Sequence, residues 1–191
     1  NAGNSITSGG NYNVTVGDEA GTALTTGDQN VFIGYQAGDA TTTAGFNIGI
    51  GYNALGANIL GGRSVAIGNA ALEVQNYSSA TDAYNVAIGH GAGEAVTTGV
   101  NNTLIGGLAG DALTTAANAT AVGYLALSAD TAGYNVAVGA FAGSGITSGT
   151  RNTAVGPASL QVATTGSDNT SFGANALKAA TTSASNTAVG S

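Results

Sequence analysis

The pentapeptide Asn85-Val86-Ala87-Ile88-Gly89 recurs in near-copies along the whole chain. Each copy ends in a glycine, and successive glycines are separated by 17, 17, 17, 21, 17, 17, 16, 17, 17 and 17 residues: Gly17, Gly34, Gly51, Gly68, Gly89, Gly106, Gly123, Gly139, Gly156, Gly173 and Gly190. A short and nearly fixed period indicates one structural unit stacked many times. We therefore expect a solenoid, and we count positions within each repeat from this glycine as position 0.

The composition departs from that of an ordinary globular domain. Only 7% of the 191 residues are charged, 32 are glycine, one is proline, and there is no Cys, Met or Trp. Typical domains contain about 25% charged residues, but regular columns of Val and Ile argue against a disordered chain. Because one unbroken repeat fills the sequence, we expect a single elongated domain over residues 1–191, a segment of a longer protein.

Three neighbouring columns predict a β-strand in each repeat. Position −1 is Val, Ile or Phe in every copy, and position −3 is always β-branched. Position −2 is mostly Ala or another small residue, with Phe32 and Leu104 as exceptions. Side chains at −3 and −1 of a strand share one face, and we expect that face to line the core.

Positions +4 and +7 exchange one bulky side chain between them. Where position +4 is Leu, as at Leu160, position +7 is small or polar. Where position +4 is Gly, as at Gly110, position +7 is usually aliphatic, as at Leu113. A packed core conserves volume more strictly than residue identity, so both positions are predicted to reach the same internal space. A Thr-rich turn closes each repeat, and the four extra residues around 76–79 should bulge outward as a loop.

A repeat of this length has no room for two helices with their turns, and Gly, Thr and Asn disfavour helices. We therefore predict an all-β fold, a parallel β-solenoid (β-roll) of about eleven 17-residue coils with about two short strands per coil. At about 4.8 Å per coil, the rod would be of order 50 Å long.

The most regular polar column is position −4. Stacked amides can hydrogen-bond along a rod and satisfy turn backbone, so we interpret this column as a structural ladder. Its members are Asn13, Asn30, Asn47, Asn85, Asn102, Asn135, Asn152, Asn169 and Asn186, with Ser64 and Ala119 in the two remaining copies. Threonines recur at position +8, and we interpret them as turn residues rather than an ice-binding face, because adjacent threonines point to opposite sides of a strand.

Position +1 varies from copy to copy, which is typical of an outer face. Tyrosines on such a face can stack on sugars, and this makes Tyr35, Tyr52 and Tyr124 candidate surface-binding residues. The alternative is that these side chains are solvated or cover a neighbouring turn.

The sequence offers no residue set for catalysis, a metal or a cofactor. His90 is the only histidine, cysteine is absent, and carboxylates form no recurring pair. We therefore predict no enzyme, no metal site and no cofactor. The net charge of −7 leaves no basic patch for nucleic acid. No apolar run is long enough to span a membrane, so we expect no membrane insertion.

The repeat running from Asn152 to Gly166, and again from Asn169, resembles repeats of phage tail-fibre proteins and related bacterial surface proteins. The shorter phrase Ser64-Val65-Ala66-Ile67-Gly68 is similar to the head repeats of trimeric autotransporter adhesins, which have a shorter period. The resemblance implies a homotrimer of parallel β-rolls on a virion or cell surface. Columns of Ala and Gly also suggest uncharged surfaces that subunit packing would cover.

The sequence thus suggests a structural shaft or head segment of a trimeric fibre, in a phage tail fibre, that attaches to host cells. The alternatives are a bacterial surface adhesin or extracellular filament subunit, and a monomeric ice- or carbohydrate-binding solenoid. The expected partners are further copies of the chain and a host cell-surface glycan or protein, and the expected location is the virion or the cell exterior. This hypothesis requires coils stacked in register, with the Val and Ile residues before each glycine turned inward.

Overall fold

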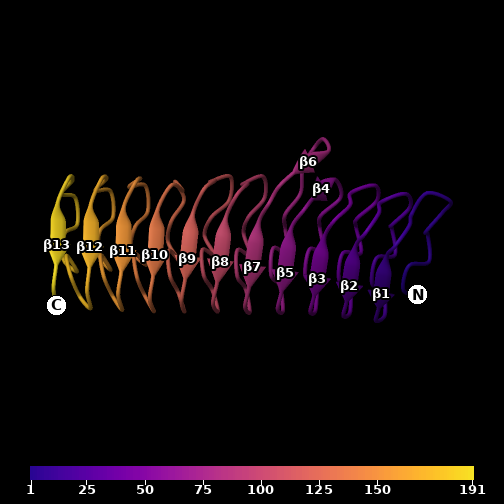
Figure 1. Ribbon diagram of the computed structural model, residues 1–191, viewed down its shortest axis with the longest axis horizontal. Coiled ribbons are helices and arrows are strands. Elements are labelled where there is room, and N and C mark those ends of the chain that lie inside the picture. The colour runs from indigo at the N-terminus through magenta and orange to yellow at the C-terminus, as the bar shows by residue number, and fades with distance from the viewer.

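The computed structural model describes all 191 residues as one stack of coils without any helix (Figure 1). Each repeat contributes one three-residue strand, and two further short strands lie near the inserted residues. The strands are β1 (Val14–Val16), β2 (Val31–Ile33), β3 (Ile48–Ile50), β4 (Gly61–Gly62), β5 (Val65–Ile67), β6 (Thr81–Asp82), β7 (Val86–Ile88), β8 (Thr103–Ile105), β9 (Thr120–Val122), β10 (Val136–Val138), β11 (Thr153–Val155), β12 (Thr170–Phe172) and β13 (Thr187–Val189).

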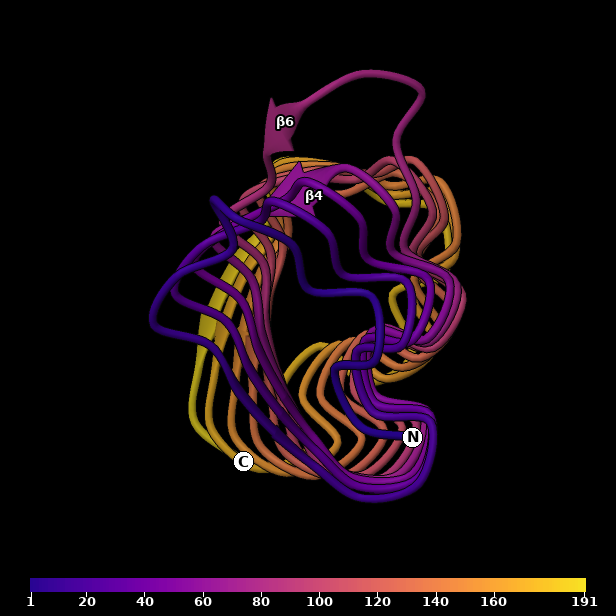
Figure 2. The ribbon, with the colours of Figure 1, turned by 90° about the vertical axis from the view of Figure 1, so that its right-hand side faces the viewer.

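Eleven of these strands form one parallel sheet that follows the order of the chain, with β4 and β6 paired separately. Neighbouring strands pair at equivalent repeat positions, so that Val65 lies opposite Val86 and Ile67 opposite Ile88. Seen along the rod, successive coils trace nearly the same outline (Figure 2). The prediction of an all-β parallel solenoid with 17-residue coils in register is therefore confirmed.

The expectation of about two strands per coil is wrong, because turns replace the second strand. Residues at positions +2 and +4 adopt left-handed backbone angles, as at Gln36 (φ 54°) and Gly38 (φ 58°). Left-handed residues interrupt extended backbone. Hydrogen bonds between coils nevertheless continue through this wall, since the Gly38 amide donates to the Ala54 carbonyl at 3.0 Å.

The core is a narrow column of small and aliphatic side chains. It joins position −2 of the strands, the Ala column at +3, and the bulky residues at +4 or +7, all within one cluster of 26 buried residues. Leu55, Leu72, Leu127 and Leu160 enter from position +4, while Leu24, Val96, Leu113 and Ile146 enter from position +7. Both positions therefore fill the same core, as predicted from the exchange between them.

The prediction that positions −3 and −1 line the core is wrong. The central residue of the strand points inward, and Phe32, Ala87 and Leu104 are fully buried. The flanking residues lie on the outer face, where Val16 is 55% and Val138 is 38% exposed. The interior of the coil is narrow, so it accepts Ala at −2 opposite Ala at +3, and the β-branched residues stack along the outside of the sheet.

Position 0 requires glycine for two reasons that Gly139 illustrates. Its φ of 133° lies in a region that L-residues rarely adopt. A β-carbon there would also lie 2.7 Å from the carbonyl carbon of Gly156 in the next coil. The column of glycines therefore lets consecutive coils approach closely at the corner after each strand.

The inserted residues form an outward loop at β6, as expected (Figures 1 and 2). Ser78, Ser79 and Ala80 are exposed, whereas Tyr77 turns back into the coil and is buried. The Tyr77 hydroxyl donates to the Gly99 carbonyl at 2.7 Å. This inward tyrosine fixes the base of the loop to the next coil.

Candidate binding surfaces

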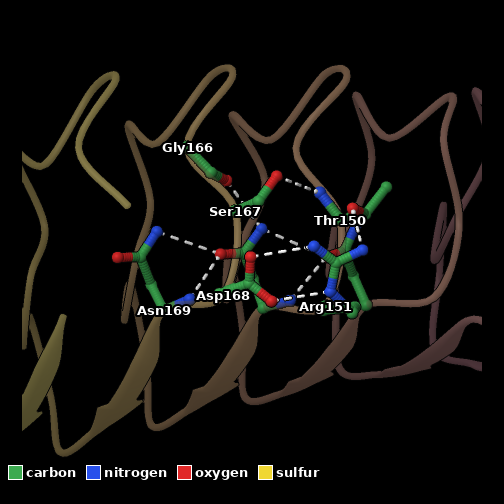
Figure 3. Close-up of polar contacts among 8 residues, drawn as sticks. Thr150, Arg151, Gly166, Ser167, Asp168 and Asn169 are labelled. Carbon is green, nitrogen blue, oxygen red and sulfur yellow. Dashed lines mark hydrogen bonds and ion pairs between the residues drawn. The ribbon is translucent and has the colours of Figure 1, made fainter. Parts of the chain in front are cut away.

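The asparagine column at position −4 runs along the inside of the turn that precedes each strand. The Asn152 side-chain oxygen accepts the Asn169 amide at 3.1 Å, and its side-chain nitrogen donates to the Gly166 carbonyl at 2.8 Å. Figure 3 shows Asn169 and Gly166 in this arrangement. The members from Asn30 to Asn169 are buried, and Asn13 and Asn186 at the two ends are half-buried. The amides are thus occupied by the fold and present no free groups to a ligand.

Where the column departs from Asn, a polar residue at position +7 makes replacement contacts. Beside Ser64, the Gln75 amide donates to Ser64 Oγ at 3.2 Å, and Gln75 Oε1 accepts from Asn85 at 2.9 Å. In the repeat that contains Ala119, the Asp130 carboxylate accepts from the Asn135 side chain at 3.0 Å. Sequence reasoning missed these buried partners, although the polar residues at +7 were a visible signal.

Burial changes the acid–base properties of two of these polar residues. It raises the pKa of Tyr77 to about 12, although a hydrogen bond from Asn85 acts in the opposite direction. Burial also raises the pKa of the Asp130 carboxyl, and hydrogen bonds from Asn135, Ala132 and Gly133 partly offset that rise. Both groups lie within the turns of the solenoid, where their contacts are structural.

The structure does not bring the three candidate tyrosines together. Tyr35 and Tyr52 stack with ring centroids 5.7 Å apart and an interplanar angle of 22°. Tyr124 lies several coils away and packs edge-on against Phe141 at 5.4 Å. The negative charge of Glu19 raises the pKa of Tyr35. All three tyrosines are exposed, so they form one aromatic pair and one separate aromatic site.

A second outer column, position −5, carries charged and aromatic residues that the sequence analysis did not single out. In this column Arg151 and Asp168 form a bidentate ion pair across adjacent coils, at 2.6 and 2.8 Å (Figure 3). The hydrogen bonds from Arg151 lower the pKa of the Asp168 carboxyl. Both side chains are exposed, and exposed pairs of this kind contribute little to stability.

The threonines at position +8 use their hydroxyl groups within the turns. Thr25 donates to the Thr42 carbonyl at 3.1 Å, and Thr147 donates to the Thr164 carbonyl at 2.9 Å. These hydrogen bonds link each coil to the next. They favour the interpretation of this column as turn residues over a row of free hydroxyls.

The outer face of the main sheet carries no charged side chain along its whole length. Position −1 is Val, Ile or Phe in every repeat, whereas position −3 is Val or Ile in six repeats and Thr in five. These side chains are partly or fully exposed. Its most exposed apolar side chains are Val189 at 78%, Phe172 at 57% and Val16 at 55%. We call this surface the strand face.

No group of three or more His, Asp or Glu side chains is positioned to hold a metal ion, and His90 is exposed and alone. None of the structure is a helix of the length and apolarity that crossing a membrane requires. Comparison with family models finds no match to the chain, and comparisons with curated proteins and with solved structures find none either. The fold defines a β-solenoid repeat protein.

Proposed function

We propose that this solenoid is a rigid structural segment of a homotrimeric fibre, located on a virion or outside a cell, that serves attachment to host cells. The observation that carries the proposal is the strand face. Ten intervals of about 4.8 Å between eleven strands give a strip about 48 Å long and about 10 Å wide, or roughly 500 Å². This area, part of which is Thr, is similar to that of the largest apolar patch on a typical monomeric protein, and such patches are often functional.

The support for this proposal differs from what the sequence suggested. The hypothesis required coils in register and inward Val and Ile residues. The first condition holds, while the second fails because these side chains form the strand face. An outward apolar face gives a more direct reason for association, since covering it removes apolar surface from water.

A further copy of the same chain suits the strand face as its partner. The row of Val, Ile and Phe at position −1 and the row of Val, Ile and Thr at position −3 repeat at the inter-strand spacing, so a parallel neighbour can match them along the whole rod. The absence of charge on the face also avoids like-charge repulsion between copies. The number of three copies comes from the resemblance to tail-fibre and autotransporter repeats. A phage tail fibre is our first choice, and a bacterial adhesin or filament subunit would use the same assembly.

A matched pair of substitutions tests the proposal. Ile105→Glu puts a charge on the strand face, whereas Thr115→Glu puts the same charge on an exposed turn of the same repeat. In sedimentation equilibrium we expect Thr115→Glu to keep the mass of the unaltered chain and Ile105→Glu to fall towards a single copy. Circular dichroism checks that both variants remain folded. An unchanged mass for a folded Ile105→Glu variant would rule out the strand face as the interface.

A further inference from the structure

The chain has one pocket, and it lies where the insertion interrupts the regular repeat. Its volume is about 360 Å³, within the range of small-molecule sites. Segment 43–46 contributes one part of its lining, residues 60, 62 and 63 a second, and segment 80–82 a third. We call this site the insertion pocket.

Four side chains at or beside the insertion pocket hold one another in place. The Arg63 guanidinium lies 4.5 Å from the centre of the Phe46 ring, and its Nε donates to Asp82 Oδ1 at 3.0 Å. The guanidinium is also 6.0 Å from the ring centre of Tyr84, whose hydroxyl donates to Asp82 Oδ2 at 3.5 Å. Stacking and ion pairing therefore orient a donor and an acceptor at the surface before any ligand arrives.

The insertion is what adds the third part of the pocket lining. The β6 segment pairs with β4, with Thr81 opposite Gly61 and Asp82 opposite Gly62. The Thr81 amide donates to the Leu60 carbonyl at 3.2 Å, and the Ala83 amide donates to the Gly62 carbonyl at 3.0 Å. These contacts place Asp82 beside Arg63. Arg151 occupies the same column as Arg63, position −5, and also pairs with an aspartate of the next coil, but the Arg151–Asp168 pair lines no pocket.

We propose that the insertion pocket binds a neutral sugar ring. A pyranose combines an apolar C–H face, which packs on an aromatic ring, with hydroxyl groups that both donate and accept hydrogen bonds. Phe46 supplies an exposed ring in the lining, and Tyr84 supplies a second exposed ring beside it. Arg63 can donate, Asp82 can accept, and Thr43 and Thr81 are also lining residues. The charge of Arg63 is already balanced by Asp82, which disfavours an anionic ligand.

This inference rests on the proposed attachment role for its biological meaning and names the class of ligand that such attachment would use. It can fail separately, because sugar binding occurs at the insertion pocket and association at the strand face. A chain that binds sugar as a single copy would contradict the proposed fibre but support the proposed sugar site. A trimer that binds no neutral sugar would support the fibre but contradict the sugar site.

The test is a titration of the ¹⁵N-labelled chain with glucose, galactose, mannose, N-acetylglucosamine, lactose and maltose, followed by the amide signals of Gly45, Gly62 and Asp82. We expect saturable shifts with at least one of these sugars. Arg63→Ala should weaken that binding at least tenfold, while the matched control Arg151→Ala should leave it unchanged. Phe46→Leu keeps an apolar side chain and removes the aromatic face, so it should also weaken binding.

Thermal unfolding by circular dichroism establishes that each variant is folded. Absence of saturable shifts at these amides for all six sugars would overturn the proposal. So would equal affinity of folded Arg63→Ala and the unaltered chain, or an equal loss in Arg151→Ala. N-acetylneuraminic acid is included as an acidic sugar, and binding confined to it would contradict a neutral ligand.

Discussion

Leu104 occupies the space that a side chain at position 110 would need: a β-carbon added to Gly110 would lie 2.7 Å from Leu104 Cδ2. Gly93 in the preceding repeat lies equally close to the same leucine, with a β-carbon at 2.6 Å from Cδ1. Phe32 has the same relationship with Gly38. A large residue at position −2 is thus accommodated by glycine at position +4. This explains why Phe32 and Leu104 are tolerated in the otherwise small residues of position −2.

The first prediction is that even a methyl side chain at position 110 destabilises the fold, because Leu104 occupies the space. Gly110→Ala should destabilise the fold by about 2–4 kcal/mol, because it combines a left-handed backbone angle with overpacking against Leu104. Gly107→Ala in the same repeat is the control, since its added β-carbon meets nothing closer than Tyr124 Cδ2 at 3.5 Å. It should change stability by less than about 0.5 kcal/mol. Urea unfolding measures both, and equal stability of the two variants would contradict the packing described here.

The second prediction tests the position +4 leucines as core residues. Leu160 is fully buried, and Leu160→Ala should cost about 2–5 kcal/mol of unfolding free energy. Val162, two residues later, is 43% exposed, so Val162→Ala should cost far less. A loss below about 0.5 kcal/mol for Leu160→Ala would remove this position from the core.

The third prediction tests the asparagine ladder. Asn102 accepts the Ala119 amide at 2.9 Å and donates to the Ala116 carbonyl at 3.0 Å. Asn102→Ala leaves two buried backbone groups without partners and should cost about 2–4 kcal/mol, at about 1–3 kcal/mol for each group. The exposed Asn69 makes no side-chain hydrogen bond, and Asn69→Ala should be close to neutral. If both variants unfold at the same urea concentration, the ladder does not stabilise the solenoid.

The fourth prediction is a gain of stability on mild acidification. Burial raises the pKa of the carboxyl groups of Asp39, Asp111 and Asp130 above their usual value of 3.8. An acid with a raised pKa in the folded state contributes its full stabilisation below 3.8 and loses it as pH rises through the folded pKa. The lowered pKa of Asp168 has the opposite effect on the pH dependence of stability. That group is exposed, so its contribution to stability is small. Stability should therefore increase from pH 7 to pH 4.

Urea unfolding at pH 7, 5 and 4 measures this trend. Asp130→Asn removes the most buried of the three carboxyls, so the variant should show a smaller change between pH 7 and pH 4 than the unaltered chain. A steady loss of stability over the same interval would contradict the assignment of these carboxyls as buried acids.

The period of the sequence was sufficient to predict the solenoid because each repeat must satisfy the same hydrogen bonds with its neighbours. It also predicted the shared core space of positions +4 and +7 and the outward insertion. The face of the strand was assigned incorrectly, because positions −3 and −1 hold the most regular columns of β-branched residues in the repeat. The pairing of Phe32 with Gly38 and of Leu104 with Gly110 was the available signal that position −2 faces inward.

The candidate sites were harder to predict. Sequence spacing placed Tyr35 and Tyr52 one repeat apart, which is why they stack, but it could not show that Tyr124 has Phe141 as its partner. The insertion pocket depends on the pairing of β6 with β4. A four-residue insertion predicts a loop, but its length does not reveal which side chains the loop brings beside Arg63.

The most direct test of the account is the molar mass of the unaltered chain in solution, measured by light scattering during size-exclusion chromatography. If copies of the chain cover one another's strand faces in threes, the mass should be three times 18.2 kDa, about 55 kDa. A particle of 18.2 kDa that persists at high protein concentration would show that the apolar face of the sheet stays open to water, which contradicts the proposed fibre.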